Sequence, residues 1–314
     1  MRLPRILFVL GKGGVGRTTV SAALGLALAA RGERVLVFEW TVADPIAPWF
    51  GLPPVGPQPA EVAPGLAVAN YDLDEALRAY FVDHLRLRLF YRRIVHGRHV
   101  RRLIRAAPGI AEMLFLGQLW WLTTLAEREA GLRFDRIVVD APATGHGASL
   151  LDLPATLSGM GAGGMLGLEI RRVVEMMSDP EWTGAMVVAL PEELAIDETR
   201  ELVPRVTERL RRAPIAALVN RSVTRWVAAD GASGALLALG QRLSPEARGG
   251  LELLHEELSA RARREGELRG LLSGATREGT ISIDEQLAAM GLQSPGDVVR
   301  AVAQRLAALE PGSP

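Results

Sequence analysis

The chain has 314 residues, no net charge at pH 7 and no cysteine, which excludes disulfides and thiolate metal sites. The balanced charge creates no global field that would draw the protein toward nucleic acid or a membrane. Apolar residues make up 48% of the chain, enough for a sizeable core. No uncharged apolar run approaches the length of a transmembrane segment and no signal peptide is recognisable, so we expect a cytoplasmic protein.

A glycine-rich turn follows the first predicted strand. The apolar run 5–10 is typical of a buried parallel strand, and the Ala- and Leu-rich stretch 19–30 predicts a helix. Glycines between them would let successive N–H groups face a phosphate, and Thr18 is placed to ligate Mg²⁺. The usual pattern has lysine at the position of Arg17. The predicted phosphate-binding residues are Gly11, Gly13, Gly14, Val15, Gly16, Arg17, Thr18 and Thr19.

Further apolar runs predict a mostly parallel sheet flanked by helices, because strands alternate with helical segments. The proline-rich stretch 40–64 is predicted to be mostly loop. Interleaved Glu and Arg in 245–272 predict a solvated helix, and an amphipathic helix is expected from Ser294 onward. We expect one α/β domain over 1–314 with a helical elaboration at about 72–130. The further predicted strands are 34–39, 66–70, 134–140, 184–190, 214–220 and a short edge strand at 280–283.

The loop resembles that of the ArsA-related P-loop ATPases, a family with a deviant loop reading K-G-G-x-G-K-[ST]. Lys12 matches the family's additional signature lysine, whereas Arg17 departs from the second lysine. The resemblance is strongest to the bacterial branch of paired paralogues. It implies a P-loop fold, binding of ATP or ADP with Mg²⁺, and a homodimer or a heterodimer with a related subunit, in which Lys12 acts catalytically on the partner's nucleotide.

Two later motifs also resemble this family. The run from Asp140 to His146 is similar to its switch II, which implies that Asp140 has a catalytic role and holds Mg²⁺ together with Thr18, and that His146 lies near the γ-phosphate. Asn220 ends a strand as in the family's V-N-Q motif, where the asparagine amide binds adenine. Arg221 replaces the glutamine, so adenine versus guanine stays open.

Asp44 has two interpretations. The resemblance implies a catalytic aspartate in switch I, but Asp44 lies three residues late in an ungapped alignment. The alternative is an Asp-Pro turn without chemistry.

Lys12 is the only lysine among 36 basic residues. A compact ammonium fits between phosphates where a planar guanidinium would clash, so we interpret Lys12 as functional. The alternative is that a single lysine remained in the chain by chance.

The stretch between His84 and Ala111 contains eight arginines and no acid. It could contact an acidic partner or anionic lipid, or simply form solvated helices; the balanced charge of the chain argues against nucleic acid as a partner. The apolar stretch 113–122 predicts a core helix, with a groove for a protein client as the alternative. The eight arginines are Arg86, Arg88, Arg92, Arg93, Arg98, Arg101, Arg102 and Arg105.

Three functions remain open at this point. The first is a dimer-dependent ATPase whose own-site hydrolysis is weakened by Arg17. The second is a non-hydrolysing subunit paired with an active paralogue, and the third is an arginine-rich lipid or partner adaptor. Arsenite binding is excluded because it requires cysteines.

Overall fold

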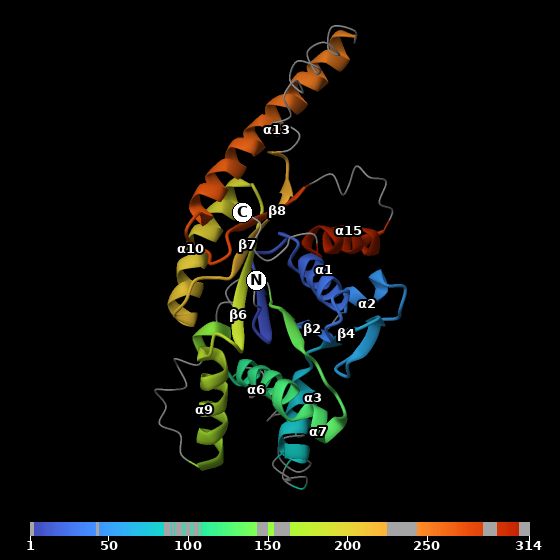
Figure 1. Ribbon diagram of the computed structural model, residues 1–314, viewed down its shortest axis with the longest axis vertical. Coiled ribbons are helices and arrows are strands. Elements are labelled where there is room, and N and C mark those ends of the chain that lie inside the picture. The colour runs from blue at the N-terminus through green and yellow to red at the C-terminus, as the bar shows by residue number, and fades with distance from the viewer. Residues whose placement is uncertain are drawn as a thin grey trace.

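A computed structural model of the chain describes residues 3–41, 44–84, 109–142, 150–153, 164–224, 244–284 and 294–307, together with the isolated positions 89, 91, 97, 102 and 107. Its centre is an eight-stranded sheet with helices on both faces (Figure 1). The α/β architecture expected from the sequence is confirmed.

The sheet has the strand order β3-β4-β2-β5-β1-β6-β7-β8, and all neighbours are parallel except β3 and β4. Because β1 lies between β5 and β6, the turn after β1 leaves the middle of the sheet's carboxyl edge, where open α/β sheets bind ligands. The strands are β1 Ile6–Leu10, β2 Val35–Glu39, β3 Ala60–Ala63, β4 Leu66–Asn70, β5 Arg136–Asp140, β6 Thr183–Ala189, β7 Ala216–Ser222 and β8 Thr280–Asp284.

One face of the sheet is covered by α1 and α15, which lie side by side, with the short α2 next to them (Figure 1). The opposite face is covered by α6, α9, α10 and α13, and α3, a π-helical segment η1 and α7 adjoin α6. These helices are α1 Arg17–Ala29, α2 Ile46–Trp49, α3 Leu73–Arg78, η1 Ala79–His84, α6 Ile110–Thr124, α7 Ala126–Ala130, α9 Gly164–Ser178, α10 Glu193–Leu210, α13 Pro245–Leu272 and α15 Pro295–Ala307.

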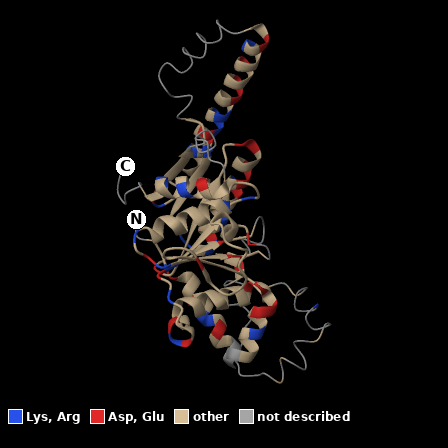
Figure 2. Cartoon of the chain, turned by 90° about the vertical axis from the view of Figure 1, so that its right-hand side faces the viewer, with Lys and Arg blue, Asp and Glu red and all other residues tan. Residues whose placement is uncertain are grey.

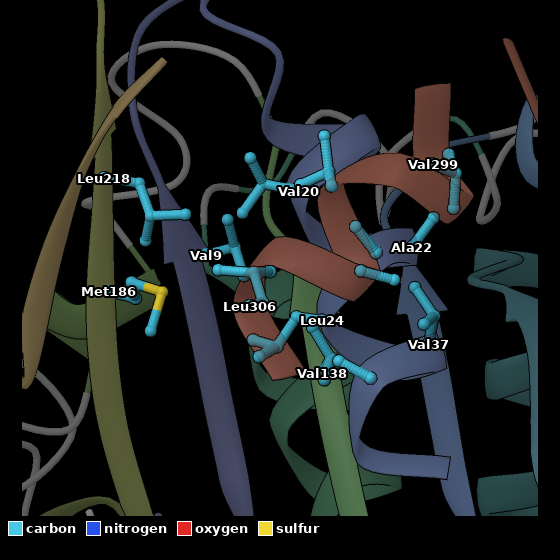
Figure 3. Close-up of a cluster of buried hydrophobic side chains, with 14 of the residues drawn as sticks. Val9, Val20, Ala22, Leu24, Val37, Val138, Met186, Leu218, Val299 and Leu306 are labelled. Atoms are coloured by element: carbon cyan, nitrogen blue, oxygen red, sulfur yellow. The ribbon is translucent and has the colours of Figure 1, made fainter. Parts of the chain in front are cut away.

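The core follows from the alternation of side chains along each strand. Val37 of β2 and Val138 of β5 point toward α1 and α15, where they meet Leu24 and Leu306 (Figure 3). Their strand neighbours, such as Phe38, point to the opposite face, against α6. In Figure 2 the ribbon of the sheet is coloured almost entirely as residues other than Lys, Arg, Asp and Glu. Two acids of its strands, Glu39 and Asp140, are buried.

The described residues of 40–64 are mostly irregular, as expected, but the stretch also contains two short elements. Ala60–Ala63 forms β3, which pairs antiparallel with β4 at the edge of the sheet. An edge strand needs few ladder bonds, so neighbouring prolines are tolerated. Ile46–Trp49 forms α2, whose Pro48 lies in the first turn, where no intrahelical N–H donor is needed.

The helix predicted at 245–272 is confirmed as α13, but its description as solvated is wrong for the C-terminal half. Glu265, Leu268 and Leu272 are buried, whereas the N-terminal half projects from the body (Figure 1). The prediction of a core helix at 113–122 is confirmed, since α6 buries Phe115 and Leu119 completely.

Some expectations fall outside the described residues, namely His146, the run 143–149 and all of the eight arginines except Arg102. The single-domain boundary of 1–314 stays a prediction. In the described part of the chain, no helix combines the length and apolar character needed to cross a bilayer.

Candidate functional site

The turn between β1 and α1 has the geometry of an anion cradle. Gly14 and Gly16 have φ angles of 83° and 89°, a left-handed region that glycine adopts without strain. A Cβ on Gly14 would meet nothing within 4 Å, so that side of the turn is open. A Cβ on Gly16 would lie 2.4 Å from Nδ2 of Asn220, so this glycine permits a close contact.

The start of α1 is left open for a ligand. Among the described residues no side chain caps this helix, and its first N–H groups lie beside a cavity of about 290 Å³. Such an uncapped N-terminus attracts anions through its N–H groups and its dipole. The cavity is lined by Gly14, Gly16, Arg17, Thr18, Thr19, Pro45 and Trp49.

Thr18 and Asp140 meet at this helix start. Thr18 Oγ1 donates to Asp140 Oδ2 at 2.7 Å, and Ser21 Oγ donates to Oδ1 at 3.3 Å. Asp140 is 8% exposed, and burial raises its pKa above the ordinary value, although Thr18, the charge of Arg17 and Ser21 oppose this shift. The structure thus brings together the two residues predicted to bind metal, while Ser21 was not anticipated.

A hydroxyl and a carboxylate are hard oxygen donors that suit Mg²⁺. In the described part of the chain, no cluster of three or more His, Cys, Asp or Glu side chains could hold a metal ion. The site therefore fits Mg²⁺ that completes its coordination with phosphate oxygens and water, as in nucleotide sites.

Arg17 turns toward the end of β5. Its Nη1 donates to the carbonyl oxygens of Ala141 at 2.7 Å and Pro142 at 2.6 Å. Burial lowers the pKa of Arg17, and the charge of Asp140 opposes the shift. The guanidinium thus links the phosphate loop directly to the segment that follows Asp140.

Lys12 forms an ion pair with Glu198 of α10, through Nζ and Oε1. The Lys12 side chain remains 41% exposed, whereas that of Glu198 is 16% exposed. The only lysine of the chain is therefore accessible at the rim of the loop and is paired within its own chain.

Asp44 accepts hydrogen bonds from three backbone N–H groups. Oδ1 accepts from Ile46 at 2.8 Å and Ala47 at 3.1 Å, and Oδ2 accepts from Val55 at 2.7 Å. Both oxygens thus fix the start of α2 and the loop that follows it. This geometry favours the structural alternative for Asp44, and its catalytic role stays a prediction.

Glu39 is a member of the site that the sequence analysis missed. It ends β2, pairs in register with Asp140 of β5 and Asn70 of β4, and is fully buried. Burial, followed by a hydrogen bond and charge repulsion from Asp44 and then by the charge of Asp140, raises the pKa of Glu39 to about 10. Its only sequence signal is an acid that ends the apolar run of β2.

Asn220 lies against the phosphate loop as its motif suggests. Nδ2 donates to the carbonyl oxygen of Val15 at 2.9 Å, and Oδ1 accepts from the N–H of Arg221 at 2.9 Å. An amide has two N–H groups and two lone pairs, so each end retains one bond to offer.

A strand, a glycine-rich loop and a helix, with Thr18 beside an acid on a neighbouring parallel strand, define a P-loop NTPase. Within this class the chain belongs to the anion-transporting ATPase family, whose model matches residues 4–161.

Three relatives illustrate the similarity. The ATPase BagA of Mycobacterium tuberculosis is 32% identical over 229 residues, which is 70% of this chain and 65% of that protein. An arsenical pump-driving ATPase of Acidiphilium multivorum is 31% identical over 62% of this chain and 36% of its own length. An ATPase ASNA1 homolog of Entamoeba histolytica is 25% identical over 63% of this chain and 70% of its own length. The chain thus spans less than two thirds of the first two relatives.

Proposed function

We propose that this protein is a cytoplasmic ATP-binding switch, a dimer-dependent ATPase whose hydrolysis at its own site is weakened. The observation that supports this most directly is the Thr18–Asp140 hydrogen bond beside the uncapped start of α1. The relatives named above are themselves described as ATPases.

In this proposal the N–H groups at the start of α1 bind the phosphates, and Thr18 and Asp140 hold Mg²⁺. The ion would neutralise charge on the phosphate oxygens. Asn220 contacts the base through the free half of its amide. The site therefore has the parts needed to bind ATP or ADP.

Two contacts support weakened hydrolysis. Arg17 replaces the lysine that reaches the β- and γ-phosphates, and its Nη1 is bound to the carbonyls of Ala141 and Pro142. Asp44, the candidate for orienting water, is bound to three backbone N–H groups. Losing charge stabilisation and water orientation together costs orders of magnitude in rate.

Lys12 supplies the reason for proposing a dimer. It is accessible at the loop, and release from Glu198 would let it reach the phosphates bound by a second subunit, either another copy or a related chain. Opening or closing of the dimer would then pass the nucleotide state to a protein client.

The contacts of Arg17 and Asp44 also favour a second candidate, a non-hydrolysing subunit that pairs with an active paralogue. Both candidates bind ATP, and only the first one turns it over. The arginine-rich adaptor has no comparable observation in its favour.

The substitution Arg17→Lys tests the proposal. Calorimetry would give the Mg-ATP and Mg-ADP affinities, and phosphate release would give kcat as a function of protein concentration. We expect slow wild-type turnover that rises per chain with concentration, and at least a roughly 10-fold higher kcat for Arg17→Lys. Lys12→Arg should abolish turnover, and Arg300→Lys, a change on the exposed face of α15, is the matched control.

Three outcomes would contradict the proposal in different ways. Absence of ATP and ADP binding by the wild type would refute both nucleotide-binding candidates. Binding without turnover in the wild type and in Arg17→Lys would select the non-hydrolysing subunit. A decrease of kcat in Arg17→Lys would show that Arg17 assists hydrolysis and does not weaken it.

A further inference from the structure

Glu265 of α13 is a fully buried acid on a helix whose other acids lie at the surface. It is 0% exposed, and the only other buried residues of α13 are Leu268 and Leu272. The two leucines pack in one cluster with Ala217 and Val219 of β7 and attach the helix to the sheet by apolar contacts. Burying a carboxylate there costs free energy unless hydrogen bonds compensate it. We therefore ask which part of the structure these hydrogen bonds fix that apolar packing does not.

Three groups that donate hydrogen bonds to Glu265 belong to residues 222–224, at the end of β7 and just after it. Oε1 accepts from Ser222 Oγ at 2.6 Å, and Oε2 accepts from the N–H groups of Val223 at 3.0 Å and Thr224 at 3.2 Å. If Glu265 were absent, these buried or half-buried donors would lose the acceptor of their hydrogen bonds. The carboxylate therefore determines the path of the backbone over 222–224.

Arg269 completes the arrangement from one turn further along α13. Its Nη2 donates to Glu265 Oε1 at 2.7 Å and to Ser282 Oγ of β8 at 2.6 Å. Burial alone would raise the pKa of Glu265, but the hydrogen bonds from Ser222, Arg269 and Thr224 outweigh it, so the pKa is lowered. Glu265 is thus ionised at neutral pH.

The segment 222–224 begins two residues after Asn220. The intervening Arg221 has a left-handed φ of 54°, and its carbonyl accepts from Arg261 Nη2 of α13 at 3.3 Å. Asn220 in turn donates to the Val15 carbonyl within the phosphate loop. Hydrogen bonds and the backbone of residues 220–224 together therefore connect α13 to the phosphate loop.

We propose that Glu265 is a positioning residue for the nucleotide base, because it fixes residues 222–224 and thereby holds Asn220 against the phosphate loop. This inference rests on the proposed nucleotide binding. It assigns base recognition in part to α13, a helix that packs on β7. Loss of Glu265 should impair recognition of the base and leave recognition of the phosphates nearly unchanged.

The test compares two ligands, Mg-ATP and Mg-tripolyphosphate, which lacks base and ribose. Calorimetry would measure both affinities in the wild type, in Glu265→Gln and in Ser222→Ala. Glu267→Gln, an exposed acid on the same helix, is the matched control. Glutamine keeps the size of the side chain but replaces one acceptor oxygen by a donor, so it cannot accept at the same time from the N–H groups of 223 and 224 and from Arg269.

We expect Glu265→Gln to weaken ATP binding at least about 10-fold, which is the effect of one lost hydrogen bond to a charged group. Tripolyphosphate binding should weaken by no more than about 2-fold. Any difference between the ATP and GTP affinities of the wild type should shrink in the same variant. Ser222→Ala should act in the same direction by about 3-fold, and it decides the question if circular dichroism shows that Glu265→Gln does not fold.

If the ratio of the ATP and tripolyphosphate affinities is the same in Glu265→Gln as in the wild type, the inference is overturned while the proposed function stays intact. If the wild type binds tripolyphosphate but not ATP, or neither ligand, the proposed function fails and the inference fails with it.

Discussion

Replacing Glu39 by glutamine should remove a pH-dependent weakness of the fold. The folded protein raises the pKa of Glu39 from an ordinary 4.5 to about 10, mainly by burial. The side chain therefore takes up a proton on folding at neutral pH. A group with a raised pKa contributes its full stability below 4.5, and this stability declines as the pH rises toward about 10.

The magnitude follows from one proton taken up on folding. Between pH 6 and pH 8 the free energy of unfolding of the wild type should fall by about 1.4 kcal/mol per pH unit through Glu39, or about 2.7 kcal/mol in total. Glutamine does not titrate and fits the local bonds. When the Asn70 amide is oriented with its nitrogen toward Glu39, 2.9 Å from Oε2, the glutamine oxygen can accept this bond while its amide faces Asp44.

Urea unfolding at pH 6, 7 and 8, followed by circular dichroism, would measure the free energy of unfolding for both proteins. The difference in favour of Glu39→Gln should grow with pH. Glu208→Gln, an exposed acid on α10, should show no such growth. Parallel pH curves for the wild type and Glu39→Gln would refute the reasoning, since they would mean that Glu39 is ionised in the folded protein.

Two further predictions concern the loop and its surroundings. Gly16→Ala should weaken ATP binding in calorimetry more than Gly14→Ala does. Both variants place alanine at a left-handed φ, which costs about 1–2 kcal/mol, but only Gly16→Ala drives a Cβ into Asn220 Nδ2. Equal losses of affinity would show that the contact with Asn220 plays no part. Asp44→Asn should lower the free energy of unfolding in urea by about 1–2 kcal/mol through lost backbone bonds, whereas unchanged stability with reduced turnover would identify Asp44 as catalytic.

Local chemistry explains what the sequence could predict. The phosphate loop was recognisable because glycines, a hydroxyl and a strand–helix context occur within about fifteen residues. The meeting of Thr18 with Asp140 could be foreseen because parallel strands share one carboxyl edge. Both predictions depend only on adjacent elements and on the order of strands.

The parts that could not be predicted depend on contacts between distant segments. Lys12 and Glu198 are 186 residues apart, and Ser222 and Glu265 are 43 residues apart. In the sequence Glu265 is one of several acids on a charged helix, and only packing against β7 distinguishes it from its neighbours. Glu39 likewise gains its raised pKa mainly from burial in the folded protein and further from Asp44 and Asp140, which the fold brings to it.

The phosphate loop leads into α1 on one face of the sheet, and these distant contacts link it to helices on the other face. Glu198 comes from α10 and Glu265 from α13, which pack on the face opposite α1. Each helix reaches the carboxyl edge with a single carboxylate, one toward the Lys12 ammonium and one toward the segment behind Asn220. If the proposed function holds, binding of a partner to α10 would act through Lys12 on the phosphates of a second subunit, whereas binding to α13 would act on the base side of the chain's own site.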